Sequence, residues 1–161
     1  MIFKGFPPVF DKNSKVLILG SFPSVKSRAA EFYYGNKQNR FWKTLYEFLG
    51  ESANTVEEKK ALCLKRGVAI WDIVDSCEIK GSSDSDIKNY KLVDLNEVLD
   101  NSDIKKILCN GTKAYELTMS VYNGGVETVK MPSTSPANVR FDKGVWLDEL
   151  ASVLSKSKPK N

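Results

Sequence analysis

The order of apolar and polar positions predicts buried strands that alternate with amphipathic helices. Short apolar runs rich in β-branched residues indicate strands over 16–19, 67–71, 104–109 and 126–131. Helices are expected over 39–49, 55–65, 94–100 and 112–121, with a last one from Trp146 to Leu154. Strands alternating with helices are typical of βαβ units. We therefore expect an α/β fold, a three-layer αβα sandwich around a mostly parallel four-stranded sheet.

A polar segment follows each predicted strand. These segments are Gly20–Ser24, Asp72, Asn110 and Pro132–Asn138. Taken alone, each is more typical of an ordinary turn or helix cap. However, the carboxyl ends of parallel strands meet at one edge of a sheet, where ligands of open α/β folds bind. The four segments together therefore predict a single active site.

Length and composition indicate one domain. The 161 residues carry a formal charge of +4, contain three cysteines without ligand spacing, and begin with no recognisable signal peptide. We expect one domain over 1–155, a flexible basic tail over 156–161, no membrane span and a cytoplasmic protein.

The residue types at the predicted edge restrict the chemistry. The chain has no histidine, which excludes imidazole acid–base catalysis and argues against a zinc site. Amides, hydroxyls and aromatic rings can stack a flat ring, hydrogen-bond its edges and position a water. No metal or cofactor is expected. Basic residues around the polar segments suggest a phosphate-binding surface, although a merely solvated basic face is an equal alternative: Lys26, Arg28, Lys37, Arg40, Lys43, Arg140 and Lys143.

Three separated motifs resemble those of the uracil-DNA glycosylase superfamily. They are Gly20-Ser21-Phe22-Pro23-Ser24, the segment Tyr33–Trp42 and the segment Met131–Asn138. The branch that they resemble most is that of the hypoxanthine-DNA glycosylases. The similarity follows the chain in the expected order and covers most of it.

The resemblance implies a role for individual residues. Phe22 stands where many members of the superfamily have a catalytic Asp or Asn, so the catalytic amide is expected to be Asn39, which holds a water. For Asn39, the plain alternative is a helix N-cap. Phe32 or Tyr33 is expected to stack on the flipped base. Phe22 is a further expected base contact. Asp72 and Asn110 are candidates for the base pocket because they stand at strand ends, where each could equally cap or close a turn. The DNA contacts expected are Ser21, Ser24, Lys26, Arg40, Ser133, Ser135, Ala137, Asn138 and Arg140.

Two departures from the family pattern bear on these roles. Related sequences often have His-Pro where this chain has Asn36-Lys37, so assistance by an imidazole is missing. Ala137 and Asn138 occupy the loop that fills the vacated base stack, and both make poor wedges.

The function implied is a monofunctional glycosylase that excises hypoxanthine from deoxyinosine. Its partner is double-stranded DNA with a deaminated base, and it is expected to act as a monomer. Three alternatives stay open: a glycosylase of the same fold acting on uracil or mismatched bases, a non-catalytic DNA- or nucleotide-binding module, and a small flavodoxin-like phosphate-binding domain.

Overall fold

The structure is a computed structural model that describes residues 2–79 and 87–154. The tail expected over 156–161 lies outside the described residues. The strands are β1 (Phe3–Lys4), β2 (Val16–Gly20), β3 (Val68–Asp72), β4 (Val74–Glu78), β5 (Lys88–Leu92), β6 (Lys106–Asn110) and β7 (Glu127–Met131). The helices are α1 (Val25–Ala30), α2 (Phe41–Leu49), α3 (Val56–Arg66), α4 (Asn96–Leu99), α5 (Thr112–Val121) and α6 (Lys143–Val153).

The central sheet is the one that the sequence predicts. Its four strands are all parallel and lie in the order β3-β2-β6-β7. Both β2 and β3 are buried along their whole length, as expected for strands of a parallel sheet that is covered on both faces. Because all four strands run the same way, the polar segments after them meet at one edge.

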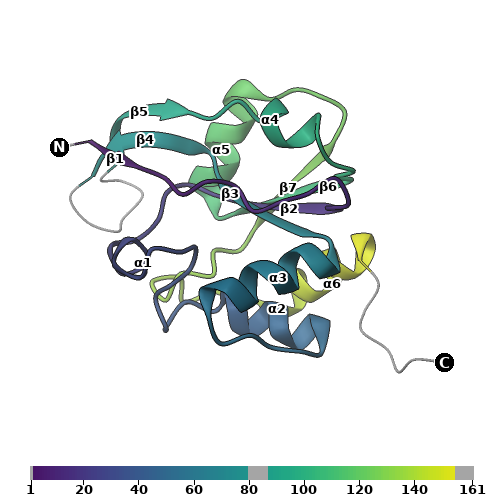
Figure 1. Cartoon of the computed structure of the whole chain (residues 1–161). Coiled ribbons are helices and arrows are strands. Elements are labelled where there is room, and N and C mark those ends of the chain that lie inside the picture. The colour runs from purple at the N-terminus through teal and green to yellow at the C-terminus, as the bar shows by residue number, and fades with distance from the viewer. Residues whose placement is uncertain (1, 80–86, 155–161) are drawn as a thin grey trace.

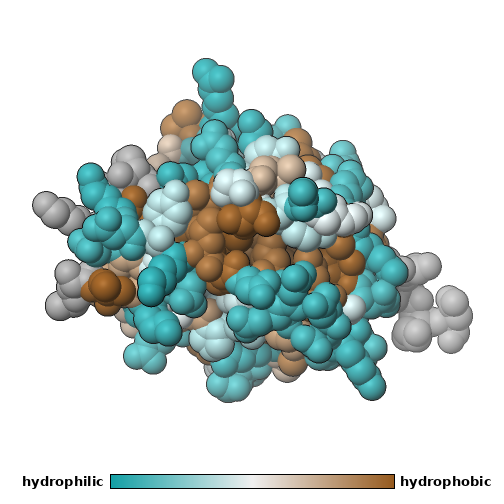
Figure 2. Space-filling view, turned by 90° about the horizontal axis from the view of Figure 1, so that it is seen from above, coloured by the Kyte–Doolittle hydropathy of each residue, from teal (hydrophilic) through white to brown (hydrophobic). Residues whose placement is uncertain are grey.

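Helices cover the two faces of this sheet (Figure 1). In that view α2, α3 and α6 lie below the sheet, and α4 and α5 lie above it. Seen from above, apolar side chains gather in the middle of the upper face within a ring of hydrophilic ones (Figure 2). The helices on both faces of the sheet confirm the three-layer αβα arrangement.

A second, three-stranded sheet is an addition that the sequence patterns did not predict. It has the order β1-β4-β5, and both of its pairings are antiparallel. Only Ile73 separates β4 from β3, so the chain passes directly from one sheet into the other. The backbone N–H of Ile73 donates to the carbonyl of Gly20 at 2.8 Å, which fixes this crossing beside the end of β2.

Helix ends differ from the expected boundaries at several points. Helix α2 begins at Phe41 rather than at Asn39, with Arg40 as its N-cap. Gly111, at φ 99°, is the N-cap of α5, which begins at Thr112 as expected. Helix α3 begins at Val56, and Thr55 caps it, since its Oγ1 accepts from the N–H of Glu58 at 3.1 Å.

No helix among the described residues is long and apolar enough to cross a membrane.

Candidate active site

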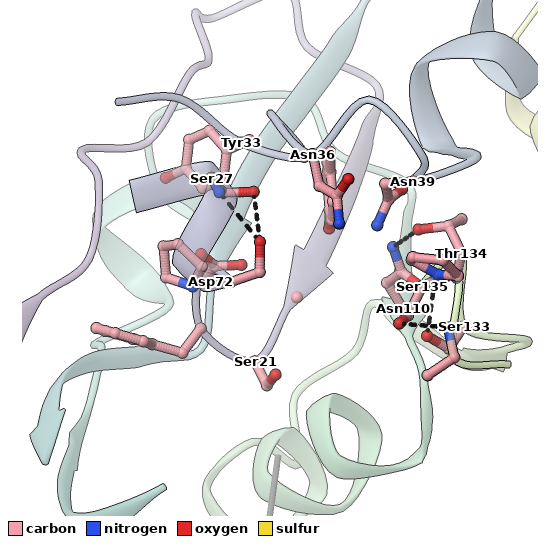
Figure 3. A pocket seen from close by; sticks show the side chains of 17 residues that line it. Ser21, Ser27, Tyr33, Asn36, Asn39, Asp72, Asn110, Ser133, Thr134 and Ser135 are labelled. Carbon is pink, nitrogen blue, oxygen red and sulfur yellow. Dashed lines mark hydrogen bonds between the residues drawn. The ribbon is translucent and has the colours of Figure 1, made fainter. Parts of the chain in front are cut away.

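A polar pocket of about 270 Å³ opens at the carboxyl edge of the central sheet (Figure 3). All four segments that follow the strands contribute to its wall, which confirms the predicted convergence. Its lining residues are Gly20–Ser24, Ser27, Tyr33, Tyr34, Asn36, Asn39, Asp72, Asn110 and Ser133–Ala137.

The end of β2 is packed tightly against an acidic side chain. A Cβ added to Gly20 would clash with Oδ1 of Asp72 and lie 2.9 Å from the hydroxyl of Tyr34. Glycine is therefore required here by close approach. Asp72, the last residue of β3, is 4% exposed, so the pocket contains a buried carboxylate. A buried carboxylate retains its charge only with polar partners, which makes this part of the wall polar by construction.

Asn39 lies in the turn before α2, and its side chain faces the pocket. Its Oδ1 accepts from the backbone N–H of Phe41 at 2.8 Å. This local bond is an Asx turn, and it directs the amide NH2 away from the helix and toward the cavity (Figure 3). Asn39 thus does not cap α2 itself, but its side chain reaches the pocket as the catalytic assignment requires.

Asn36 repeats this arrangement three residues earlier. Its Oδ1 accepts from the backbone N–H of Gln38 at 3.0 Å, and its side chain also turns into the pocket (Figure 3). In both residues the amide oxygen is held by the backbone, so the group presented to the pocket is the donor NH2. Asn36 is absent from the residues that the family resemblance assigns. The sequence feature that could have indicated it is the pair Asn36-Lys37, which stands where related sequences often have His-Pro.

Asn110 holds the last loop in place. Its Nδ2 donates to Oγ1 of Thr134 at 2.9 Å, and its Oδ1 accepts from the N–H of Thr134 at 3.0 Å. Both amide atoms are thus engaged with one buried residue. Asn110 lies in the pocket wall as expected, but its two ends are used to position the loop.

Arg40 joins the same loop from the other side. Its guanidinium donates to the carbonyl of Ser135 and, at 2.7 Å, to that of Asn138. It also lies 4.5 Å from the ring of Phe141. The sequence assigned Arg40 to DNA contact, whereas the structure engages its side chain in bracing the loop.

The loop over 132–140 is further stiffened by its own side chains. Oγ of Ser133 accepts from the N–H of Ser135 at 3.1 Å, and Oγ of Ser135 accepts from the N–H of Ala137 at 3.2 Å. Nδ2 of Asn138 donates to the carbonyl of Ser133 at 2.9 Å. Next to these bonds, Val139 is 92% exposed. A braced loop therefore presents a solvated apolar side chain beside the pocket.

The opposite wall is built on α1. Oγ of Ser24 accepts from the N–H of Ser27 at 3.1 Å, which makes Ser24 the N-cap of this helix. Oγ of Ser27 accepts from the N–H of Gly35 at 3.0 Å and so ties α1 to the segment with Asn36. Ser21 lines the pocket, while Lys26 is exposed on α1 outside the lining.

Of the two aromatic residues expected to stack on a base, only Tyr33 lines the pocket. Phe32 is buried, and its ring stacks on Trp42 with centroids 5.9 Å apart. Phe32 is therefore packed into the core and is not part of the pocket wall. Tyr34 lines the pocket instead, and Phe22 lines it as predicted. At φ 53°, Tyr34 has the left-handed backbone that L-residues rarely adopt, which turns the chain between the buried rings and the pocket.

Electrostatics keep the phenol of Tyr33 neutral. Burial, followed by the nearby Asp72 carboxylate and Tyr34, raises its pKa well above the ordinary value. Its hydroxyl shares its proton between two backbone carbonyl oxygens, that of Phe6 at 2.9 Å and that of Pro7 at 2.8 Å. Tyr33 thus presents a phenol ring to the pocket while its hydroxyl is held by backbone carbonyls. The pocket as a whole can hold a planar polar ring by donors, an acceptor and aromatic faces.

Comparison with known proteins matches these features to one family. The model of the uracil DNA glycosylase superfamily matches residues 7–153. A hypoxanthine DNA glycosylase of Methanosarcina acetivorans is 38% identical over 146 residues, covering 89% of this chain and 92% of that protein. One of Methanosarcina barkeri is 34% identical over 140 residues, covering 85% and 89%.

A solved structure agrees with the sequence comparisons. It is a solution NMR structure from Methanosarcina acetivorans, assigned provisionally as a uracil DNA glycosylase. It superposes with a TM-score of 0.79 at 35% identity, and the match covers 92% of this chain and 96% of that one. The fold, the order of the motifs and the pocket at the sheet edge have the same explanation: the chain belongs to the uracil DNA glycosylase superfamily.

Proposed function

We propose that this chain is a monofunctional DNA glycosylase that excises hypoxanthine from deoxyinosine in double-stranded DNA. The observation that carries the proposal is the pocket at the sheet edge, where the amide of Asn39 and the buried carboxylate of Asp72 line one cavity. Two relatives that cover most of the chain carry the name hypoxanthine DNA glycosylase, which supports this choice of base.

Base selection is assigned to Asp72. A carboxylate only accepts hydrogen bonds. Hypoxanthine has an N1–H where adenine has a lone pair, so the carboxylate attracts the deaminated base and repels its parent. Uracil differs from cytosine in the same way at N3. This shared N–H makes uracil the second candidate substrate, and it is the reason to test both.

Bond cleavage is assigned to the amide donors. A base inside the duplex stack is out of reach, so the nucleotide must first be extruded. The C1′–N9 bond then breaks, its electron pair leaves with the base, and C1′ becomes an oxocarbenium-like cation. Asn39 holds a water that adds to C1′, and the proton released by that water neutralises the base. The amide of Asn36 donates to the departing base as it gains charge.

Extrusion is assigned to the loop over 132–140. Ala137 and Asn138 line or flank the pocket but offer little bulk, whereas Val139 projects almost fully into solvent from the same braced loop. We infer that Val139 enters the space left by the extruded base, as apolar wedges do in bent DNA. Hydroxyls and cations around the pocket would contact the flanking phosphates: Ser21, Ser24, Lys26, Ser133, Ser135 and Arg140.

The proposal also includes a monomer acting in the cytoplasm. The three cysteines are all buried as free thiols, which fits a reducing compartment. Because none of the described residues that line the pocket is a lysine, we expect base release without strand cleavage.

The test uses duplex oligonucleotides that each contain one deoxyinosine, deoxyuridine, deoxyxanthosine or mismatched thymidine. After incubation, alkali cleaves the strand at abasic sites. We expect cleavage of the deoxyinosine strand above all others, and none without alkali. Absence of cleavage for all four would contradict the proposal, and stronger cleavage at deoxyuridine would favour the second candidate.

A further inference from the structure

A second, larger cavity continues from the pocket along the outside of α2. It has a volume of about 660 Å³ and shares Tyr34, Asn36 and Asn39 with the pocket. From there it passes the first turn of α2 and reaches the start of α3. Its other lining residues are Gly35, Lys37, Gln38, Arg40, Trp42, Lys43, Tyr46, Ala53, Asn54 and Lys59. We call this cavity the α2 groove.

The charge of the α2 groove has one sign. Among the described residues that line it, four are cationic and none is acidic. The whole chain has a net charge of only +4, so this is a strong local concentration. Within 2–79 and 87–154, no ion pair joins a carboxylate to Lys37, Lys43 or Lys59.

The four cations are not equivalent. Arg40 braces the loop over 132–140, and Lys59 lies over the ring of Trp42 at 5.2 Å, where partial burial lowers its pKa. Lys37 and Lys43 are both exposed. These two lysines are therefore the charges that the groove offers to a ligand from solvent.

We propose that the α2 groove binds the sugar–phosphate backbone of the strand that continues from the extruded nucleotide. The proposal rests on the function proposed above. The pocket takes a base, and the groove opens from the same Asn36 and Asn39, so a strand whose nucleotide enters the pocket must leave along a neighbouring surface. A backbone with one negative charge per nucleotide matches a groove whose charged residues, among those described, are all cations.

The test compares two variants with the same loss of charge. The groove variant is Lys37→Gln/Lys43→Gln. The control is Lys12→Gln/Lys105→Gln, which alters exposed lysines near the amino ends of β2 and β6, at the opposite edge of the sheet. Binding to an intact duplex is measured between 50 and 200 mM salt. Each phosphate contact contributes about 0.9 to the slope of log K against log salt for a duplex.

We expect the slope of the groove variant to be smaller than that of the wild type by about 1.8, from two lost phosphate contacts, and the control to keep the wild-type slope. Equal slopes for all three proteins, or equal losses in both variants, would overturn the proposal. The proposal would also be overturned if polyglutamate displaced the bound duplex from the wild type as readily as competing DNA does.

The two proposals fail separately. If the wild type releases no base but the groove variant alone shows a smaller salt slope, the glycosylase proposal is wrong and the strand-binding groove stands. If the wild type releases hypoxanthine and the salt slopes of all three proteins are equal, the strand-binding proposal is wrong and the glycosylase proposal stands.

Discussion

At the scale of single residues, the pocket is defined by which atom each amide presents. The side-chain oxygens of Asn36 and Asn39 each accept a hydrogen bond from the backbone N–H two positions later. The side-chain amide of Asn110 both donates to Thr134 and accepts from it. The three asparagines that line the pocket therefore have two different roles. Asn110 positions a loop, and the other two present donors to a ligand. Donors suit a departing base, on which negative charge develops.

Replacing Asn36 by Asp tests this use of a donor. The aspartate can still accept from the N–H of Gln38, so the turn is kept, while the NH2 is lost. We expect single-turnover excision of hypoxanthine to fall about 10²-fold, the usual effect of losing one such donor. Gln38→Glu, which adds the same charge at an exposed neighbour, is the control. An equal loss in both variants would mean that Asn36 acts through charge alone.

Residue identity predicted some of the pocket but not the direction of every side chain. Asn39, Asp72 and Tyr33 all line it, as the motifs indicate. Phe32 does not, because the chain reverses at Tyr34 with φ 53°, and three consecutive aromatic residues give no sign of where such a reversal falls. The role of Arg40 was also hidden, since its partners are backbone carbonyls almost a hundred positions away.

At the scale of elements, the four parallel strands were predictable because β2, β3 and β6 are short apolar runs and the segment that contains β7 is rich in β-branched residues. The second sheet was not. Strand β5 is exposed along most of its length, and its apolar residues are only Tyr90 and Leu92, too short an alternation to indicate a strand. Strand β4 follows β3 with a single intervening residue, so the two look like one run. Helix α1 has six residues, too few to show a helical period.

The loop over 132–140 is the element with the clearest testable consequence. If Val139 fills the vacated stack, it matters only where a stack exists. We expect Val139→Ala to slow excision from duplex DNA about tenfold, or about 1.4 kcal/mol, and to leave excision from a single strand unchanged. Val139→Leu should keep duplex activity.

Val121→Ala provides the matched control, since Val121 is also apolar and 56% exposed but ends α5. Its rates should equal those of the wild type on both substrates. A similar loss on duplex and single strand for Val139→Ala would show that the substitution disturbs the loop itself.

At the scale of the whole molecule, the thiols report on the integrity of the core. Burial raises the pKa of Cys63 to about 12 and that of Cys109 to about 11. In the unfolded chain a thiol has a pKa of about 8.5. The folded state therefore keeps protons that the unfolded state loses as the pH rises above that value, so alkali favours unfolding.

We expect the free energy of unfolding to be insensitive to these thiols below pH ~8.5 and to fall above it, by about 1.4 kcal/mol per pH unit for each thiol. Urea denaturation at a series of pH values up to about 10 measures this. Cys63→Ala, although less stable throughout, should show a shallower decline by one thiol. An unchanged decline in that variant would contradict the buried, protonated state of Cys63.

The central claim for the molecule is that its polar pocket releases hypoxanthine through Asn39. Direct detection of the free base by chromatography, in a single turnover with deoxyinosine duplex, tests it most closely. The wild type should yield one free hypoxanthine per intact abasic strand. Asn39→Ala, which removes the amide that holds the water, should bind the same duplex yet release the base at least about 10²-fold more slowly. Undiminished release of hypoxanthine by this variant, or none by the wild type, would contradict the account.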